Sequence, residues 1–571
     1  MIALLIFQYF IIACFFEHNQ IQRYNVLFCN PSSMGDFVAD YIIVGGGLTG
    51  CAIASRLSTS DKKPEVILLE AGPDASDNPV TAGFLSGLTL LGGELDYAYS
   101  SEPVTDTANR AHQLNAGKVL GGGSVLNFGG WLRADAADYD QWAEVAGDKR
   151  WSYEGLRPWL IKTERYDDAQ AASHRGIDGP MHVTPISKAE SGARKYPLRE
   201  TVKQAWAELG VLINSDKASG STAGLSEMHE NSYNGLRQPS NKAYSLDNVR
   251  VFTNTMVHRI TFDGNKATGV ELADDRRITA RKEVILSAGS YHTPQILMLS
   301  GIGPSATLSE YGVPMVYDSP QVGQNLHDHF AIYLAFRLRD PSLGHALGSA
   351  GFQKPEFSKG FPWDWVASLP LPEDVIAKNK AEELKKRNFY EIITAYVPPG
   401  IPGIPVDGTH IATSTMLLLP TSRGTVSIRS SSPHDPPRIQ PSYFSTPIDQ
   451  DALIHATRQT VKVLTETEAM KPIVESESPP SGDGLEGLKP LTVDASNEMI
   501  EERIRLTGTQ HHHSGGTAAM GKVVDGEGRV FGVQGLRVGD ASIIPVPLGG
   551  HPQTALYAIA EELADMIIRD F

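Results

Sequence analysis

One segment near the start of the chain constrains the fold more than any other. Between residues 40 and 72, a short apolar strand, a glycine-rich turn, a helix of small residues and a second apolar strand follow one another. The turn has the spacing G-x-G-x-x-G, at Gly45, Gly47 and Gly50. In that spacing the first glycine allows a tight turn, the second lets the backbone approach a pyrophosphate, and the third lets the helix pack closely on the strand. The segment therefore predicts a Rossmann-like unit that binds a dinucleotide.

The same segment indicates where the parts of a dinucleotide would lie. The helix after the turn begins near Leu48 and Thr49, so the backbone N–H groups there are expected to face the phosphates. The second strand, EVILLE, ends in Glu70, whose carboxylate can accept hydrogen bonds from ribose hydroxyls. The alternative is a glycine-rich turn that binds no nucleotide. The flanking strands and the acidic residue at this distance favour the nucleotide.

Size and charge exclude some classes of protein. At 571 residues the chain exceeds the roughly 100–200 residues of one domain, so at least two lobes are expected. Asp and Glu together number 66, Lys and Arg together number 50, and the formal net charge is −16. No cluster of Lys and Arg stands out. Because nucleic-acid binding needs cations that neutralise phosphates, no nucleic-acid partner is expected.

The N-terminal part bears on localisation. Residues 1–33 form an apolar extension, and its most apolar part, residues 1–16, is shorter than the roughly 20 residues that span a bilayer. The extension is interpreted as a signal peptide, a signal anchor or a non-native start before Met34. A start at Met34 favours a cytoplasmic protein, and secretion or a membrane anchor is the alternative. Membrane association is expected only if residues 1–16 are retained. Three cysteines, Cys14, Cys29 and Cys51, do not indicate a disulfide framework.

The rest of the chain predicts further strands and a terminal helix. Residues 249–289 alternate like antiparallel strands around a turn at 263–265. Residues 340–408 are rich in proline and glycine and are expected to form long loops or a lid. The segments HIATSTMLLLP and GTVSIRS are expected in the sheet of a second lobe, and the last helix is expected to begin at Pro552. The predicted fold class is α/β, with an α+β second lobe.

Five further motifs, in order along the chain, resemble those of one enzyme family. They are GKVLGGGSVLNFGGWLR at 117–133, GSYHTPQILMLSGIG at 289–303, VGQNLHDH at 322–329, HSGGTAAMG at 513–521 and GVQGLRVGDASIIP at 532–545. With the glycine fingerprint, they are similar to the glucose–methanol–choline (GMC) family of FAD-dependent oxidoreductases. The resemblance implies a Rossmann-like FAD-binding region over 38–330, a mainly substrate-binding lobe with an antiparallel sheet over 331–505, and a return to the FAD domain over 506–571.

The resemblance also implies which residues contact FAD beside the fingerprint residues. They are Gly122 and Asn127 beneath the flavin, Val257 at the adenine, Asp540 and Ala541 near the ribityl–phosphate arm, and Pro552 at the start of the last helix. The positive end of that helix would favour an anionic reduced flavin. Some relatives link the flavin covalently through a histidine just before the asparagine. Here that position is Leu126, so non-covalent FAD is expected.

The histidines are assigned in the same way. His513 matches the family histidine three residues before Gly-Thr, and His551 matches its second active-site position, so these two are the predicted catalytic residues. His511 and His512 have no such assignment and are expected to line the site or face solvent. A metal site at the three consecutive histidines is the alternative, but no acidic or cysteine partner stands at ligand spacing, and no metal is predicted. The triplet at 327–329 is interpreted as a buried, hydrogen-bonded turn.

The implied activity is FAD-dependent oxidation of a primary or secondary alcohol to the aldehyde, the ketone or a lactone. His513 would act as the base while hydride passes to flavin N5. The partners would be a small-molecule alcohol and an electron acceptor, either O2 or a quinone-type compound. A role in specialised metabolism is a further hypothesis. The sequence predicts no oligomeric state.

Two other classes compete with this activity. One is a lyase on the same scaffold, similar to the hydroxynitrile lyases, which uses FAD without redox chemistry. The other is a binding protein with a relic cofactor site, which the complete fingerprint and both histidines disfavour. Substrate identity is not predicted. A cluster of aromatic residues indicates either an apolar pocket or a packed lid: Phe352, Phe357, Phe361, Trp363 and Trp365.

Overall fold

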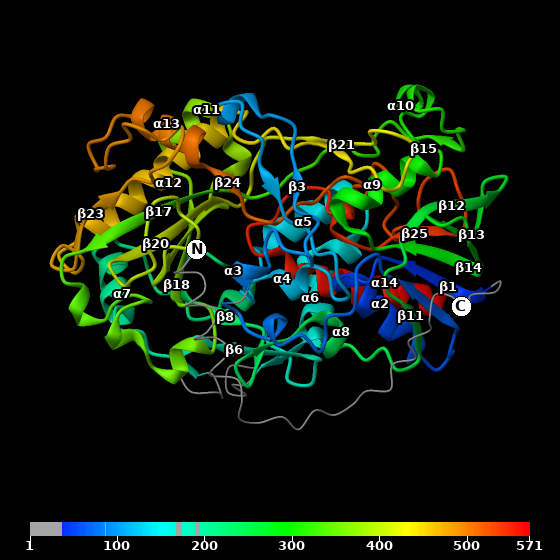
Figure 1. Ribbon diagram of the computed structural model, residues 1–571, viewed down its shortest axis with the longest axis horizontal. Coiled ribbons are helices and arrows are strands. Elements are labelled where there is room, and N and C mark those ends of the chain that lie inside the picture. Colours follow the sequence, from blue (N-terminus) through cyan, green and yellow to red (C-terminus); the bar gives the residue numbers. More distant parts are fainter. Residues whose placement is uncertain (1–36, 86, 167–173, 189–193) are drawn as a thin grey trace.

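The computed structural model describes residues 37–85, 87–166, 174–188 and 194–571. Its frame is two large sheets that lie at opposite ends of the long axis, with helices and loops between them (Figure 1). The N-terminal extension and the cysteines Cys14 and Cys29 lie outside the described residues. Within the described residues, no helix is both long and apolar enough to cross a membrane.

The first sheet is mixed and contains seven strands. In spatial order they are β11 (Val249–Phe252), β2 (Val66–Leu69), β1 (Phe37–Val44), β14 (Arg277–Leu286), β13 (Lys266–Leu272) and β12 (Val257–Asp263), with β25 (Leu536–Val538) also pairing with β14. The strands β11, β2, β1, β14 and β25 are parallel neighbours, whereas β13 and β12 are antiparallel. The parallel part confirms the predicted Rossmann-like core, and the hairpin turn at 263–265 is where the sequence predicts it.

The glycine-rich turn leads from β1 into α2 (Leu48–Ser58). This helix is almost entirely buried because small residues such as Cys51, Ala52 and Ala54 let it lie close to the sheet. It also packs against α14 (Pro552–Arg569), which begins at the predicted proline. The chain thus returns from its C-terminus to the nucleotide-binding unit, through β25 and α14.

The second sheet is antiparallel throughout and also contains seven strands. They are β23 (Val474–Ser478), β17 (Phe330–Leu338), β20 (His410–Leu417), β19 (Asn388–Ala395), β18 (Trp363–Pro370) and β7 (Gly224–Glu227), with β24 (Thr509–Gln510) also pairing with β17. One face is covered by α12 (Pro447–Thr465). Strand β24 leads directly into the three histidines at 511–513, so the sheet holds that segment in place.

One prediction about the second lobe is wrong, and another holds only in part. The proline-rich region 340–408 is not mainly long loops, because β18 and β19 cross the sheet there and α11 (Glu373–Asn379) lies between them. Pro362, Pro370 and Pro372 stand at the ends of β18 and α11, where a missing N–H costs little. The segment GTVSIRS forms β21 (Thr425–Ser427), which pairs with β22 (Arg438–Gln440) in a separate two-stranded sheet.

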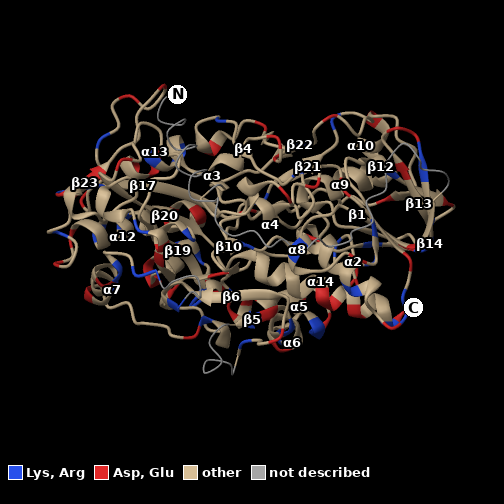
Figure 2. Ribbon diagram, turned by 60° about the horizontal axis from the view of Figure 1, so that its bottom comes forward, with Lys and Arg blue, Asp and Glu red and all other residues tan. Residues whose placement is uncertain are grey.

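Charged residues lie mostly toward the outer edges of the molecule, with both signs interspersed (Figure 2). The region between the two sheets is mostly uncharged in the same view.

Candidate functional site

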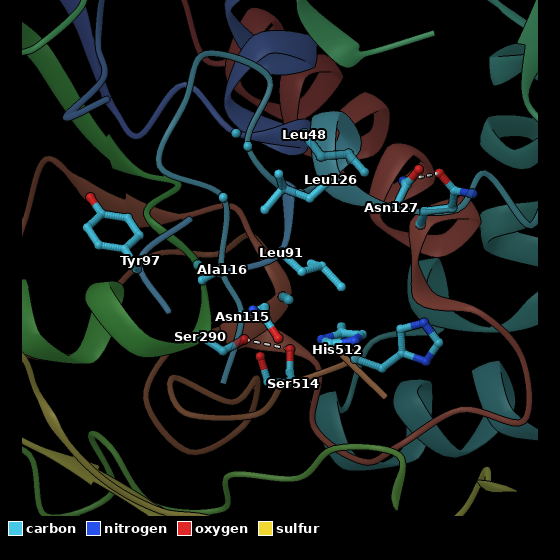
Figure 3. A pocket seen from close by; sticks show the side chains of 18 of the residues that line it. Leu48, Leu91, Tyr97, Asn115, Ala116, Leu126, Asn127, Ser290, His512 and Ser514 are labelled. Carbon is cyan, nitrogen blue, oxygen red and sulfur yellow. Dashed lines mark hydrogen bonds between the residues drawn. The ribbon is translucent and has the colours of Figure 1, made fainter. Parts of the chain in front are cut away.

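A large cavity is lined by residues of both sheets. Its volume is about 1240 Å³, above the roughly 300–1,000 Å³ of a pocket for one small ligand. The space therefore suits a cofactor and a substrate together. In Figure 3, Leu48, Leu126 and Asn127 lie on one side of the cavity, and Asn115, Ser514 and His512 lie across from them.

Almost every residue predicted for the cofactor lines this one cavity. These are Gly45, Gly47, Leu48, Thr49, Glu70, Gly122, Asn127, Val257, Asp540, Ala541 and Pro552. Gly50 is the exception among the predicted residues. It lies inside α2, where a Cβ would stand 2.0 Å from the carbonyl oxygen of Gly45. Gly50 therefore allows the turn to close on the helix and does not form the wall of the cavity.

The turn and the start of α2 form a cradle for an anion. Gly47 is the N-cap of α2 and makes no side-chain hydrogen bond to it. The first turn of α2 contains no acidic residue. Its N–H groups are thus available to a phosphate, which the helix dipole also favours. A Cβ on Gly122 would stand 2.7 Å from Cα of Gly47. Only glycine lets these two segments meet, and the cradle fits the pyrophosphate of a dinucleotide.

Glu70 has a further role that the sequence pattern did not reveal. Its buried carboxylate accepts hydrogen bonds of 2.8 Å from the backbone N–H groups of Gly46 and Gly72. Burial raises the pKa of Glu70 to about 7. Each carboxylate oxygen has a second lone pair, so the predicted contact with ribose hydroxyls remains available. Glu70 therefore braces the fingerprint turn as well as facing the cavity.

Asp540 and Asn127 are also held by the protein. One oxygen of Asp540 accepts hydrogen bonds from the N–H of Gly289, at 2.8 Å, and from the hydroxyl of Thr293, at 2.6 Å. Burial raises the pKa of Asp540. Asn127 donates its amide to Gln553 at 3.1 Å and accepts from the N–H of Gly129 at 3.0 Å. These contacts orient both side chains at the wall of the cavity.

The two predicted catalytic histidines come together in the cavity. The ring centroids of His513 and His551 are 5.0 Å apart, although the residues reach this point from β24 and from the start of α14. Nε2 of His551 is 2.8 Å from the Glu391 carboxylate, so this nitrogen donates. Although burial raises the pKa of Glu391, the charge and hydrogen bond of His551 hold it below its ordinary value.

A hydrogen-bonded chain assigns the tautomer of His513. Nε2 of His329 is 3.1 Å from the carbonyl oxygen of Leu548, which can only accept, so Nε2 carries the proton. In the neutral ring, Nδ1 of His329 is then an acceptor, and it lies 2.9 Å from Nδ1 of His513. His513 must therefore donate from Nδ1, which leaves the lone pair on its Nε2.

Two features keep His513 neutral and in place. Burial lowers its pKa well below the ordinary value, and the neighbouring His329 and His551 lower it further. Its backbone N–H donates to the carboxylate of Asp328 at 2.7 Å. Burial raises the pKa of Asp328 to about 7. A neutral imidazole with a free Nε2 lone pair is the form that can accept a proton.

Sequence reasoning missed two of these partners. His329 stands in the triplet that was interpreted as a buried turn, and the structure shows a buried triplet whose third residue supports His513. Glu391 was not singled out, yet it is an acidic residue within the apolar run FYEIITAYV. A charged residue inside a buried strand is rarely left unpaired, and that signal could have identified it.

The remaining predicted residues divide between the cavity and the core. His511 and His512 line the cavity, as do Phe361 and Trp363 of the aromatic cluster. Phe352 and Phe357 instead pack on each other and on Tyr196. Among the described residues, no group of three or more His, Cys, Asp or Glu side chains is arranged to hold a metal ion.

Comparisons with known proteins agree on one family. Two family models match, both described as GMC oxidoreductase, over residues 39–331 and 420–560. The chain is 39% identical over 548 residues to the GMC-type oxidoreductase acuG of Aspergillus aculeatus. That alignment covers 93% of this chain and 99% of the relative. It is 32% identical over 575 residues to an oxygen-dependent choline dehydrogenase of Escherichia coli. That alignment covers 92% of this chain and 95% of the dehydrogenase. One solved structure with the same fold is a formate oxidase from Aspergillus oryzae, which was studied for its FAD modification. It matches with a TM-score of 0.85 and 26% sequence identity, over 94% of this chain and 99% of the oxidase.

Proposed function

This chain belongs to the GMC oxidoreductase family, and we propose that it oxidises a primary or secondary alcohol to an aldehyde, a ketone or a lactone. One observation supports this proposal above the others. The ring centroids of His513 and His551 are 5.0 Å apart in the cavity that contains the dinucleotide cradle. His329 orients the ring of His513, and Glu391 orients the ring of His551. Such a pair can remove a proton from a hydroxyl group and hold the oxygen that remains.

FAD is the cofactor of this family. The fingerprint glycines and the N-terminus of α2 would hold its pyrophosphate, with Glu70 at the ribose. Bound FAD supplies the acceptor for the hydride that leaves the substrate carbon. We propose that FAD is bound without a covalent link, because Leu126 occupies the position from which a histidine would form that link.

The two histidines would have different roles at the substrate oxygen: one would accept its proton and the other would stabilise the oxygen that remains. Nε2 of His513 takes the hydroxyl proton, and the electrons of the O–H bond form the new C=O bond as hydride leaves the carbon. The ring of His551, which Glu391 orients through its hydrogen bond at Nε2, would stabilise the developing alkoxide. His329 holds His513 in the tautomer that leaves its base free.

A spectroscopic experiment tests this function. The purified holoprotein is mixed without oxygen with a panel of neutral, cationic and sugar alcohols, and the flavin absorption band is followed. We expect at least one neutral alcohol to bleach the band, and its aldehyde, ketone or lactone to form in equal amount. Admitting air then separates O2 as acceptor, with rapid return of the band, from a quinone-type acceptor, with slow return. A flavin that no alcohol bleaches would contradict the proposal.

The lyase alternative gains no support from the comparisons, because none of the relatives described above is a lyase. The same experiment addresses it. A lyase would convert its substrate while the flavin stays oxidised throughout.

The pH dependence of flavin reduction should show the low pKa of His513. The base must be neutral, and burial lowers its pKa well below 6.5. Protonation therefore begins only in more acidic solution. In Asp328→Asn, which removes the neighbouring carboxyl group with a pKa of about 7, the rate constant of anaerobic reduction by an uncharged alcohol should stay constant from about pH 8 down to pH 6.5 and fall only below that range. A loss of rate with its midpoint at or above pH 6.5 would contradict this assignment.

Removing the Glu70 carboxylate should weaken FAD retention. Glu70→Ala leaves the N–H groups of Gly46 and Gly72 without their acceptor and removes the proposed ribose contact, so we expect the dissociation constant of FAD to rise by about tenfold or more. Glu70→Gln keeps one acceptor oxygen and should have a smaller effect. FAD content after gel filtration and the melting temperature of the apoprotein separate cofactor loss from unfolding. Undiminished FAD affinity in Glu70→Ala would remove this residue from the site.

A further inference from the structure

The cavity contains a second polar pair that the proposed reaction does not use. The hydroxyl of Tyr333 lies 2.9 Å from Nδ1 of His511, and both side chains line the cavity. Tyr333 comes from the middle of β17, and His511 follows β24. The His511 ring is 5.2 Å from that of His513 and 6.2 Å from that of His551. The pair thus lies beside the catalytic histidines, on the side of the substrate lobe.

The pair is held in place by the backbone around it. The N–H of His511 donates to the carbonyl oxygen of His329 at 2.9 Å. Tyr333 stands opposite Ser414 of β20, and Ser414 stands opposite Ile393 of β19, so the three form one row on the cavity face of the sheet. Burial lowers the pKa of His511 well below its ordinary value. A neutral His511 that uses Nδ1 for Tyr333 keeps its Nε2 for another hydrogen bond.

Aromatic side chains form another part of the same cavity. Phe128, Phe361 and Trp363 follow one another with ring centroids 5.0 Å and 4.6 Å apart, and we call them the aromatic wall. The indole N–H of Trp363 donates to Glu230 at 3.0 Å, and Glu230 is paired with the fully buried Arg194. This buried ion pair fixes the orientation of Trp363, so the wall presents rigid, flat, apolar surface.

Charge is absent from this part of the described lining. The only Asp, Glu, Lys or Arg residues among the described residues that line the cavity are Glu70 and Asp540, which belong to the cofactor end. A charged substrate would lose its hydration there without gaining a counterion. A flat, uncharged ligand would instead bury its faces on the aromatic wall and direct a polar edge to polar side chains of the same cavity, among them the Tyr333–His511 pair.

We propose that Tyr333 and His511 anchor a second oxygen of an uncharged aromatic or heteroaromatic alcohol. This inference rests on the proposed alcohol oxidation and names its substrate class. The ring would lie on the aromatic wall, its reacting hydroxyl would face His513 and His551, and its second hydroxyl or carbonyl oxygen would bind the Tyr333–His511 pair. A site built to bind a substrate oxygen rejects analogues that lack it, so this pair would determine specificity.

The first test measures binding without chemistry. Phenol and fluorobenzene, which have similar shapes, are titrated into the holoenzyme while the spectrum of the oxidised flavin is followed. We expect phenol to bind roughly tenfold more tightly than fluorobenzene, and Tyr333→Phe to abolish most of this preference. Tyr390→Phe is the matched control, because Tyr390 lies in the same sheet, opposite Leu417, and does not line the cavity. An unchanged preference in Tyr333→Phe, or none in the wild type, would overturn the proposal.

The second test uses turnover. The ratio of kcat/KM for 3- or 4-hydroxybenzyl alcohol to that for benzyl alcohol should exceed one in the wild type, fall about tenfold in Tyr333→Phe and stay unchanged in Tyr390→Phe. The change should lie mainly in KM, with an unaltered pH profile. Equal loss for all three alcohols would mean that Tyr333 only braces His511, which contradicts an anchoring role. If no alcohol reduces the wild-type flavin, the proposed oxidation fails, and the binding test still decides the anchor.

Discussion

His513→Ala should bind FAD normally and be reduced by the alcohol about 10²–10⁴-fold more slowly than the wild type. The substitution removes Nε2 of His513, which the hydrogen-bonded chain through His329 leaves free to take the hydroxyl proton. Without that base, hydride transfer must proceed from the neutral alcohol. Anaerobic stopped-flow measurement of flavin bleaching gives the rate constant directly, without interference from reoxidation.

Two controls make the His513 result specific. Added imidazole should restore part of the lost rate, because the vacated space admits a free base. His455→Ala should reduce normally, because this half-buried histidine lies on α12 and packs on Tyr390, away from the cavity. Reduction of His513→Ala at the wild-type rate would show that another group takes the proton.

His551→Ala should slow flavin reduction by about 10²–10³-fold, the effect of losing one preorganised donor to a developing negative charge. It also leaves the Glu391 carboxylate buried without its partner. His551→Asn keeps a hydrogen-bond donor and should retain more of the rate than His551→Ala. The measurement is again anaerobic stopped flow, at saturating alcohol, with FAD content determined for each variant.

Glu391→Gln separates the two contributions to the His551 effect. The Gln amide keeps a hydrogen-bond partner near Nε2 of His551 but removes the negative charge beside that ring. Its rate should therefore lie between those of the wild type and His551→Ala. Equal rates in the wild type and in His551→Ala would contradict the role of His551 at the substrate oxygen.

The cofactor end of the site could be predicted because its determinants are local. A strand, a glycine turn and a helix follow one another within residues 40–72, so backbone geometry alone sets their arrangement. The same locality explains why the hairpin at 263–265 and the helix from Pro552 lie where they were expected. Gly50 shows the limit of the pattern. The motif identifies a glycine that the fold needs, but not whether it touches the ligand or only the packing behind it.

The partners of the histidines could not be predicted because they depend on contacts distant in the sequence. His329 meets His513 across 184 positions, and Glu391 meets His551 across 160. These contacts arise only when β24 pairs with β17 and when the second sheet brings β19 beside the start of α14. The strands β18 and β19 were themselves hidden in a proline-rich region, because their flanking prolines resemble loop composition.

An isotope experiment tests whether hydride passes from the alcohol carbon to bound FAD. The best alcohol from the panel is prepared with deuterium on its hydroxyl-bearing carbon and mixed anaerobically with the holoprotein. We expect the flavin to bleach more slowly with the deuterated alcohol than with the ordinary one, with one carbonyl product formed per flavin reduced. Product formation while the flavin remains oxidised would contradict hydride transfer to FAD.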